Sequence, residues 1–143
     1  GSQNLNRNVN YPSTDYIAYC FAPVEGYSAI GSYTGNGSAD GPFVYTGFKP
    51  RYLLVKCSSA LGRWIIRDTA RDEFNSGTSA KLSADLAQEE NNSSTIGTAS
   101  QTTVDFLSNG FKVRSDGGNS NDNSVTYVYF AVAENPFKTA RAR

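Results

Sequence analysis

The stretch TTVDFLSNGFKVRS, residues 102–115, decides the fold class. Apolar residues alternate with polar ones on both sides of its centre, with Val104 and Phe106 before the Ser-Asn-Gly at 108–110 and Phe111 and Val113 after it. Alternation with a period of two is the pattern of a half-buried strand, and Asn-Gly between two such runs is a strong hairpin signal. The stretch therefore predicts two antiparallel strands joined by a tight turn.

Similar strand-like runs recur along the chain. Short β-rich runs, bounded by Gly, Pro, Ser and Asn, occupy residues 15–27, 41–48, 50–57, 62–68 and 124–137. Leu82 and Leu86 have helical spacing, but the Ser-, Thr-, Asn- and Gly-rich stretch around them favours a long surface excursion with one strand or helical turn. Many short strands with turn signals between them indicate an all-β fold, an antiparallel two-sheet β-sandwich of jelly-roll type.

The sandwich is expected to form one module over residues 15–138. Residues 1–14 are interpreted as a tag remnant, Gly1-Ser2, and a lead-in segment, and residues 139–143 as a disordered tail. The inner faces of the two sheets are expected to draw on the apolar positions of the strand-like runs, namely Ile17, Tyr19, Phe21, Phe43, Tyr45, Leu53, Val55, Ile65, Val104, Phe106, Phe111, Val128, Phe130 and Val132.

Composition argues against several classes of function. Lys and Arg number 13, equal to Asp and Glu, so no net charge attracts nucleic acid. No run approaches the 18 apolar residues of a membrane span, so no membrane insertion is expected. The chain contains no histidine, which removes the commonest general base, and the spacing of its carboxylates selects no catalytic pair. We expect no enzymatic activity and no catalytic residues.

Charged and sulfur-containing side chains are assigned structural roles. Arg67, Asp68, Arg71 and Asp72 are expected to form a surface charge network at a strand end. Cys20 and Cys57 each lie in an apolar run, where a thiol behaves as a small hydrophobe, so both are expected to be buried and free, although a disulfide remains an alternative. Two cysteines without histidine cannot form a common zinc site.

The glycine-rich stretch at residues 31–50 raises the question of a phosphate loop. Gly35, Gly37 and Gly41 have the wrong spacing for one, and a strand-like run follows them where a helix is needed. We interpret the three glycines as positive-φ positions of a turn, with Asn36 and Asp40 making local hydrogen bonds to the backbone.

Two sets of residues are candidates for binding. The tip of the glycine-rich stretch and one aromatic residue near a strand start are candidate ligand contacts, and Tyr33 is the aromatic residue expected to be exposed. These candidates are Tyr33, Asn36, Ser38, Asp40 and Trp64. The stretch DGGNSNDN, residues 116–123, offers hard oxygen donors that suit calcium, although the EF-hand order is absent. Its candidate ligands are Asp116, Asn119, Asn121 and Asp122. No other cofactor is expected.

Two segments of the chain resemble each other. DYIAYCFAPVEGY at residues 15–27 and TYVYFAVAENPF at residues 126–137 share a Tyr, a β-branched residue, aromatic residues, an Ala and a Pro in the same order. Chance is one explanation. The other is that the end of one module resembles the start of this one, as in tandem repeats of a domain.

A series of motifs resembles a module of bacteriophage tail-fibre and virion proteins, notably those of phages of marine bacteria. The motifs are the run at residues 16–56, WIIRDTAR at 64–71, DFLSNGFKVR at 105–114 and YVYFAVAENPFK at 127–138. The likeness covers residues 16–138, and Pro23 departs from it where the family more often carries an acidic residue. In that family the module ends in a Tyr- and Ala-rich strand and can stand in tandem.

The resemblance implies a non-catalytic module of a phage tail fibre or virion appendage, located in the virion. Its implied role is attachment to a host-surface glycan or protein, with self-association, plausibly as a homotrimer. Two alternatives remain open: a purely structural spacer of the fibre, and an accessory domain of a carbohydrate-active enzyme. Aromatic residues near turns and strand ends favour glycan binding where they are exposed, because sugar rings stack on such side chains.

Overall fold

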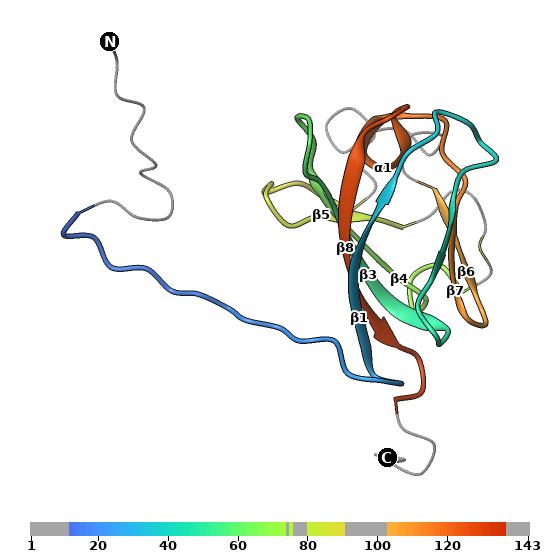
Figure 1. The fold of residues 1–143 in the computed structure, drawn as a ribbon, viewed down its shortest axis with the longest axis horizontal. Coiled ribbons are helices and arrows are strands. Elements are labelled where there is room, and N and C mark those ends of the chain that lie inside the picture. Colours follow the sequence, from blue (N-terminus) through green and yellow to red (C-terminus); the bar gives the residue numbers. More distant parts are fainter. Residues whose placement is uncertain (1–11, 74, 76–79, 91–102, 137–143) are drawn as a thin grey trace.

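A computed structural model describes residues 12–73, 75, 80–90 and 103–136 of the chain. The described residues form a β-sandwich from which an extended N-terminal segment leads away (Figure 1). The expected tag remnant, most of the lead-in segment and the predicted tail at 139–143 lie outside the described residues. Within the described part, no helix is long and apolar enough to cross a membrane.

The larger sheet has five antiparallel strands in the order β1-β8-β3-β4-β5. Strand β8 pairs along its length with β1 on one side and β3 on the other, so the last strand of the chain lies within the sheet. The strands are β1 (Ser28–Thr34), β3 (Pro50–Cys57), β4 (Trp64–Asp68), β5 (Leu82–Ser83) and β8 (Thr126–Ala133). The two-residue β5 agrees with the one strand expected in this stretch, of which residues 74, 76–79 and 91–100 lie outside the described residues.

The smaller sheet has three antiparallel strands in the order β2-β7-β6. These are β2 (Phe43–Tyr45), β6 (Val104–Leu107) and β7 (Gly110–Val113). The hairpin predicted from residues 102–115 is confirmed, because Val104 pairs with Val113 and Leu107 with Gly110 across the turn. A single helical turn, α1 (Gly118–Asn121), separates β7 from β8.

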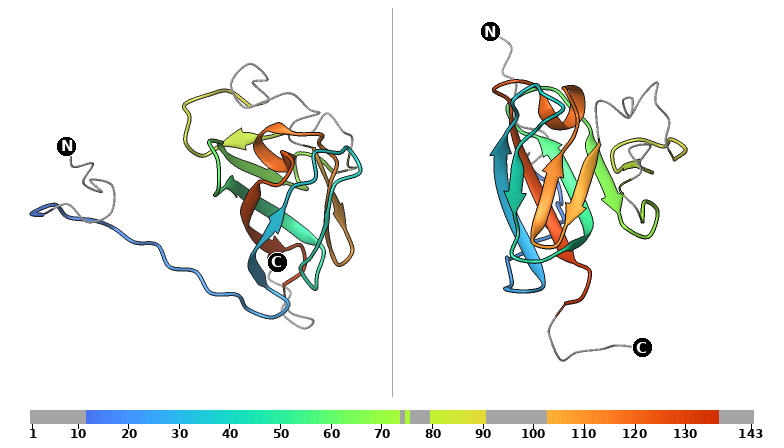
Figure 2. Two further views of the ribbon diagram at one scale, coloured as in Figure 1. Left: turned by 45° about the horizontal axis from the view of Figure 1, so that its top comes forward. Right: turned by 90° about the vertical axis from the view of Figure 1, so that its right-hand side faces the viewer.

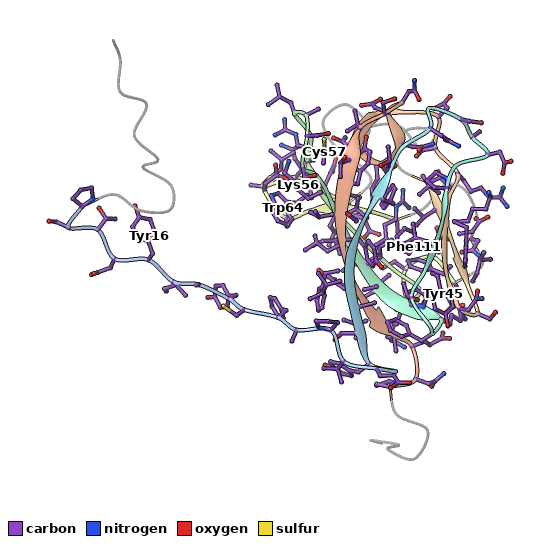
Figure 3. All side chains as sticks on the ribbon, in the orientation of Figure 1. Tyr16, Tyr45, Lys56, Cys57, Trp64 and Phe111 are labelled. Atoms are coloured by element: carbon purple, nitrogen blue, oxygen red, sulfur yellow. The ribbon has the colours of Figure 1, made fainter. Side chains whose placement is uncertain are left out.

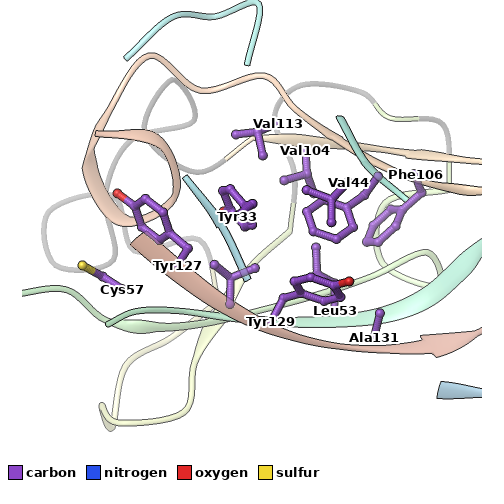
Figure 4. Close-up of a cluster of buried hydrophobic side chains, with 12 residues drawn as sticks. Tyr33, Val44, Leu53, Cys57, Val104, Phe106, Val113, Tyr127, Tyr129 and Ala131 are labelled. Carbon is purple, nitrogen blue, oxygen red and sulfur yellow. The ribbon is translucent and has the colours of Figure 1, made fainter. Parts of the chain in front are cut away.

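The two sheets pack face to face, which confirms the all-β sandwich (Figure 2). The strands divide five and three between the sheets, and the finer jelly-roll assignment stays a prediction. Aromatic rings fill the centre of the core: Phe111 of the smaller sheet meets Tyr129 edge to face at 5.3 Å, and Tyr33 stacks on Tyr127 at 5.2 Å (Figure 4). Burying a side chain such as Phe111 or Leu53, both 0% exposed, contributes about 1.5–3 kcal/mol.

The predicted core is confirmed for one group of residues and wrong for another. Of the predicted core residues, those that the structure buries are Leu53, Val55, Ile65, Val104, Phe106 and Phe111. In β8 the expected inward face is wrong by one residue, because Tyr127, Tyr129 and Ala131 are buried while Val128 is 39% exposed. Phe130 and Val132 share the outward face of Val128. In β2, Val44 points inward, so Phe43 and Tyr45 are exposed.

The strand predicted at residues 15–27 is not formed. Only Val24 makes a bridge, to Ser28, and residues 14–23 run outside both sheets. Ile17, Tyr19 and Phe21, expected in the core, are 83, 80 and 66% exposed. The first strand of the sheet is instead β1. Its sequence, SAIGSYT, contains Gly and Ser, which are more typical of turns and loops than of strands.

Candidate functional site

The two polar loops predicted to bind ligands meet at one end of the sandwich. The N–H of Gly35 donates to Val125 O at 2.8 Å, and the N–H of Gly37 donates to Asn121 O at 2.9 Å. In return, the N–H of Ser124 donates to Gly35 O at 3.0 Å. The loop between β1 and β2 is therefore fastened by its backbone to α1 and to the residues that follow it.

Asn121 is the centre of this loop cluster and is fully buried. Its Oδ1 accepts from the N–H of Asn36 at 2.9 Å. Its Nδ2 lies 2.9 Å from Asn36 Oδ1, 2.8 Å from Ser38 O and 2.6 Å from Ser115 O, all acceptors. A side-chain amide has two donor hydrogens and one acceptor oxygen, so this one is used fully inside the protein. Asn121 thus holds the fold together at this end.

Two of the other predicted calcium ligands, Asn119 and Asp122, accept hydrogen bonds from the backbone. Asn119 Oδ1 accepts from the N–H of Arg63 at 2.9 Å, and Asp122 Oδ1 accepts from the N–H of Gly118 at 2.7 Å. Asp116 is exposed. Among the described residues, no three Asp, Glu, Cys or His side chains lie close enough together to hold an ion. Calcium at this loop stays a prediction, and its binding would have to compete with these internal bonds.

The glycines of the first loop serve mainly to allow close approach. Gly37 has a φ of +66°, but neither Gly35 nor Gly41 is among the positive-φ residues, so the expectation for those two is wrong. A Cβ at Gly35 would overlap the backbone of Asp122, and one at Gly41 would lie 2.6 Å from Val113 O. The glycines let this loop lie directly against the end of β7 and the residue that follows α1.

Asn36 makes the local hydrogen bonds to the backbone that the sequence predicts, whereas the Asp40 side chain pairs with Lys112 and Arg114, so the expectation is wrong for Asp40. Asn36 Nδ2 donates to Asp40 O at 3.0 Å, and the N–H of Asp40 donates to Ser38 Oγ at 3.2 Å. The Asp40 side chain, 82% exposed, lies 2.7 Å from Lys112 Nζ. The hydrogen bond from Lys112, together with its charge, lowers the pKa of the Asp40 carboxyl. The Asp40 carboxylate is therefore an exposed charge at this end.

Tyr33 is not exposed, so its assignment as a surface ligand contact is wrong. The side chain lies in the core with 8% exposure, and its hydroxyl donates to Ser120 O at 2.8 Å. Burial raises the pKa of the Tyr33 hydroxyl far above its usual range. Tyr33 lies in β1, where its position in the alternation turns it toward Tyr127 and the opposite sheet.

Trp64 is exposed as expected, and it lies beside an apolar hollow. The hollow has a volume of about 370 Å³ and opens on the outer face of the five-stranded sheet. Figure 3 shows Trp64 on the side of the sandwich opposite Tyr45, which belongs to the smaller sheet. The hollow is lined by Tyr19, Phe21, Ile30, Leu54, Trp64, Val128, Tyr129 and Phe130. All these side chains are uncharged, so the hollow suits an apolar occupant.

Sequence reasoning missed this outer face. Strand β3 reads PRYLLVKC and β8 reads TYVYFAVA, so both strands carry large apolar residues at odd and at even positions. A strand with one solvated face alternates apolar and polar residues, whereas a strand covered on both faces is apolar throughout. That signal was present in the sequence and indicates a sheet whose two faces both require partners.

Two cationic side chains, those of Arg67 and Lys81, are buried. Arg67 is 3% exposed, so its expected place in a surface network is wrong, whereas Arg71 and Asp68 do form a surface pair at 3.1 Å. Lys81 is 2% exposed. Burial, and then the charge of Arg67, lowers the pKa of Lys81 to about 8. Burial lowers the pKa of Arg67 to about 10, which the neighbouring Asp72 partly opposes.

The two cysteines differ in environment. Cys57 is buried as expected, and its thiol donates to Ala60 O at 3.1 Å. Cys20 is exposed on the N-terminal segment, so its predicted burial is wrong. Neither forms a disulfide in this structure.

One comparison assigns the chain to a protein family. A family model described as a domain of unknown function, DUF7483, matches residues 2–136. The chain belongs to this family. The DUF7483 match spans both sheets and includes the exposed N-terminal segment as well as the sandwich. Comparisons with curated proteins and with solved structures give no significant match.

Proposed function

We propose that this chain is a non-catalytic module of a phage tail fibre or virion appendage, and that its main task is assembly of that appendage. The motif series at residues 16–138 supports the phage setting through its resemblance to virion proteins. The structure supports the assembly role through the apolar outer face of the five-stranded sheet. Location in the virion is part of the same proposal.

The carrying observation is that the outer sheet face and the N-terminal segment are both apolar and exposed. Ile30, Val128 and Trp64 on the face are 41, 39 and 40% exposed. Contiguous exposed apolar patches on soluble proteins mark interaction sites, because leaving such area in water is unfavourable. By contrast, the polar end that was the first candidate for ligand binding uses much of its hydrogen-bonding capacity internally.

The experiment is to look for the chain in the particle. Virions of the phage that encodes it are banded on a density gradient, and their proteins are identified by mass spectrometry. Peptides of this chain are expected in the banded particles, and antibodies against it are expected to label the tail or an appendage in electron micrographs. Absence of the chain from purified virions would contradict the proposal.

Attachment to a host glycan is a second candidate, favoured by the surroundings of Trp64. Trp64 follows Arg63 in the chain, its backbone N–H donates to Asp85 Oδ1 at 3.1 Å, and the side chains of Arg63 and Asp85 form a pair at 3.6 Å. An aromatic face beside hydrogen-bonding groups is suited to a sugar ring, which stacks with its apolar side and bonds with its hydroxyls. Glycan-array binding that is lost in Trp64→Ala and retained in Tyr45→Ala would support this candidate. Equal binding by the two variants would contradict it.

A further inference from the structure

Residues 16–22, called the arm below, form an apolar segment outside the sandwich. The arm runs extended and leads away from the β1 end of the larger sheet, and Tyr16 lies on it far from the sandwich (Figures 1 and 3). Ile17 and Tyr19 are at least 80% exposed, and Phe21 is 66% exposed. None of the seven residues carries a charge. Exposed apolar side chains at alternate positions are unfavourable in water, which indicates that the arm is covered by something else.

The arm has the residue pattern of β8. It reads YIAYCFA, and residues 127–133 of β8 read YVYFAVA, with Tyr first and Ala last in both. At the second, fourth and sixth positions both segments carry large apolar residues. In β8 these three residues turn toward the outer face of the sheet, while the residues between them are buried. The arm therefore has the alternation of a strand with one strongly apolar side, yet it pairs with no strand among the described residues.

The outer face of the five-stranded sheet is the complementary surface on the same chain. At the base of the arm, the ring of Phe21 lies on the ring of Phe130, with centroids 5.0 Å apart. Tyr19 and Phe21 of the arm line the hollow together with Ile30, Leu54 and Trp64, yet both arm residues are still at least 66% exposed. The chain thus carries an apolar arm that borders an apolar hollow on its own sheet but leaves most of its own apolar surface in water.

We propose that the arm of one copy covers the outer face of the five-stranded sheet of a second copy. This inference rests on the proposed assembly function and names its partner as another copy of this chain. A second copy supplies an uncharged apolar strand of the same chemistry as the hollow, and reciprocal exchange between identical chains closes the assembly. Each copy would then have both its arm and its face removed from water.

The exposed aromatic side chains of the arm and the face supply a little under half of the area that such an exchange needs. Tyr19, Phe21 and Trp64 are 80, 66 and 40% exposed. An aromatic side chain buries about 150–250 Å² when covered, so these three offer roughly 350 Å² per copy. A stable interface takes about 800 Å² from each partner. The aliphatic side chains of the arm and face, Ile17, Ile30, Leu54 and Val128, add to the aromatic contribution.

The first test is the molar mass of the full chain in solution, measured by light scattering on a sizing column. A multiple of the 15.4 kDa chain is expected. The arm variant Ile17→Ser/Tyr19→Ser/Phe21→Ser is expected to run as a single chain, and the face variant Val128→Glu likewise. Tyr45→Ser, which removes an aromatic residue 67% exposed on the smaller sheet, is the matched control and should keep the assembly. A monomeric full chain, or loss of assembly in Tyr45→Ser alone, overturns the proposal.

Mixing the two variants distinguishes arm exchange from simple packing of face against face. The arm variant keeps an intact face, and the face variant keeps an intact arm. Exchange therefore predicts a mixed complex of one copy of each, detectable by native mass spectrometry, in which one arm covers one face. If the mixture stays monomeric while both variants show the thermal unfolding of the full chain, arm exchange is wrong. That result leaves the virion test untouched, so the two proposals can fail separately.

Discussion

Asn36 and Asn121, 85 positions apart in the chain, form two hydrogen bonds with each other. The N–H of Asn36 donates to Asn121 Oδ1, and Asn121 Nδ2 donates to Asn36 Oδ1, both at 2.9 Å. This pairing joins the loop after β1 to α1, which closes one end of the sandwich. From the sequence, Asn36 was a candidate ligand contact and Asn121 a candidate calcium ligand. In the structure their side chains bind each other.

Replacing Asn121 by Ala is expected to destabilise the protein by about 2–4 kcal/mol. The change leaves the N–H of Asn36 and the carbonyls of Ser38 and Ser115 without their buried partner. Urea denaturation followed by tryptophan fluorescence measures the free energy of unfolding. Asn123→Ala, in an exposed neighbour, is the control and is expected to cost less than about 0.5 kcal/mol. Equal effects of the two changes would contradict the structural role of Asn121.

Replacing Gly35 by Ala is expected to cost about 2–3 kcal/mol, because the new methyl group would overlap the backbone of Asp122. The comparison is Gly26→Ala, where the φ of +72° strains an alanine but no atom lies within 4 Å of the new Cβ. Backbone strain alone predicts about 1 kcal/mol there. A smaller effect at Gly35 than at Gly26 in the same denaturation experiment would show that the loop does not lie against Asp122.

Replacing Tyr33 by Phe is expected to destabilise the protein by about 1–2 kcal/mol without changing any glycan binding. The change removes the hydroxyl that donates to Ser120 O inside the core, and leaves that carbonyl without this donor. Tyr45→Phe is the matched change on an exposed ring and should leave the free energy of unfolding unaltered. If Tyr33→Phe weakened ligand binding at unchanged stability, Tyr33 would have to be a surface contact after all.

The free energy of unfolding is expected to rise between about pH 8 and pH 10. The pKa of Lys81 is lowered to about 8 in the folded protein, whereas an unfolded lysine has a pKa near 10.4. In this window the unfolded chain binds more protons than the folded one, so stability increases with pH, by about 1–2 kcal/mol. Above about pH 10 the raised pKa of the buried Tyr33 opposes the rise, because unfolding lets that hydroxyl ionise.

The control for this pH dependence is Lys81→Met, which removes the titrating amine and keeps an unbranched side chain. Denaturation curves at half-unit steps from pH 7 to pH 10 compare the two proteins. The rise is expected in the parent chain and absent in the variant. An identical slope in both would mean that another group causes it.

Strands whose signal is local could be predicted from the sequence. The β6-β7 hairpin follows from alternating residues around a short turn, and β3 follows from the apolar run Tyr52–Val55 inside PRYLLVKC. Strand β1 could not be predicted in this way, because its Gly31 and Ser32 have loop-like propensities. Pairing with β8 overrides those propensities, and Gly31 lies opposite Tyr129, where a Cβ would be only 3.0 Å from the tyrosine ring.

The arm shows the opposite error. Residues 16–22 have the composition and alternation of a strand, and the sequence predicted one. A strand also needs a partner with free backbone groups, and no strand in the part of the chain that the structure describes pairs with the arm. Strand propensity measures how well a residue fits a half-buried pleated surface, so it does not say where that surface is.

The candidate site could be predicted only in part. The sequence identified the polar loops and Trp64, but it could not show that Asn36 and Asn121 would satisfy each other across 85 residues. It also could not assign faces in β8, where Val128 and Tyr129 are both apolar enough to be buried. Neighbouring residues of a strand point to opposite faces, so an error of one residue exchanges the face predicted to be buried with the face predicted to be exposed.

The sequence by itself determined the fold class, the hairpin and the position of most strands, because these depend on the local order of apolar, polar and turn-forming residues. Only the tertiary structure decided which face of β8 is buried, that Tyr33 belongs to the core, and that the glycine-rich loop closes against α1. These outcomes depend on contacts between residues far apart in the chain, where packing and hydrogen-bond satisfaction outweigh local preference. For the same reason, the uncovered outer face and the arm became visible only once the sheets had formed.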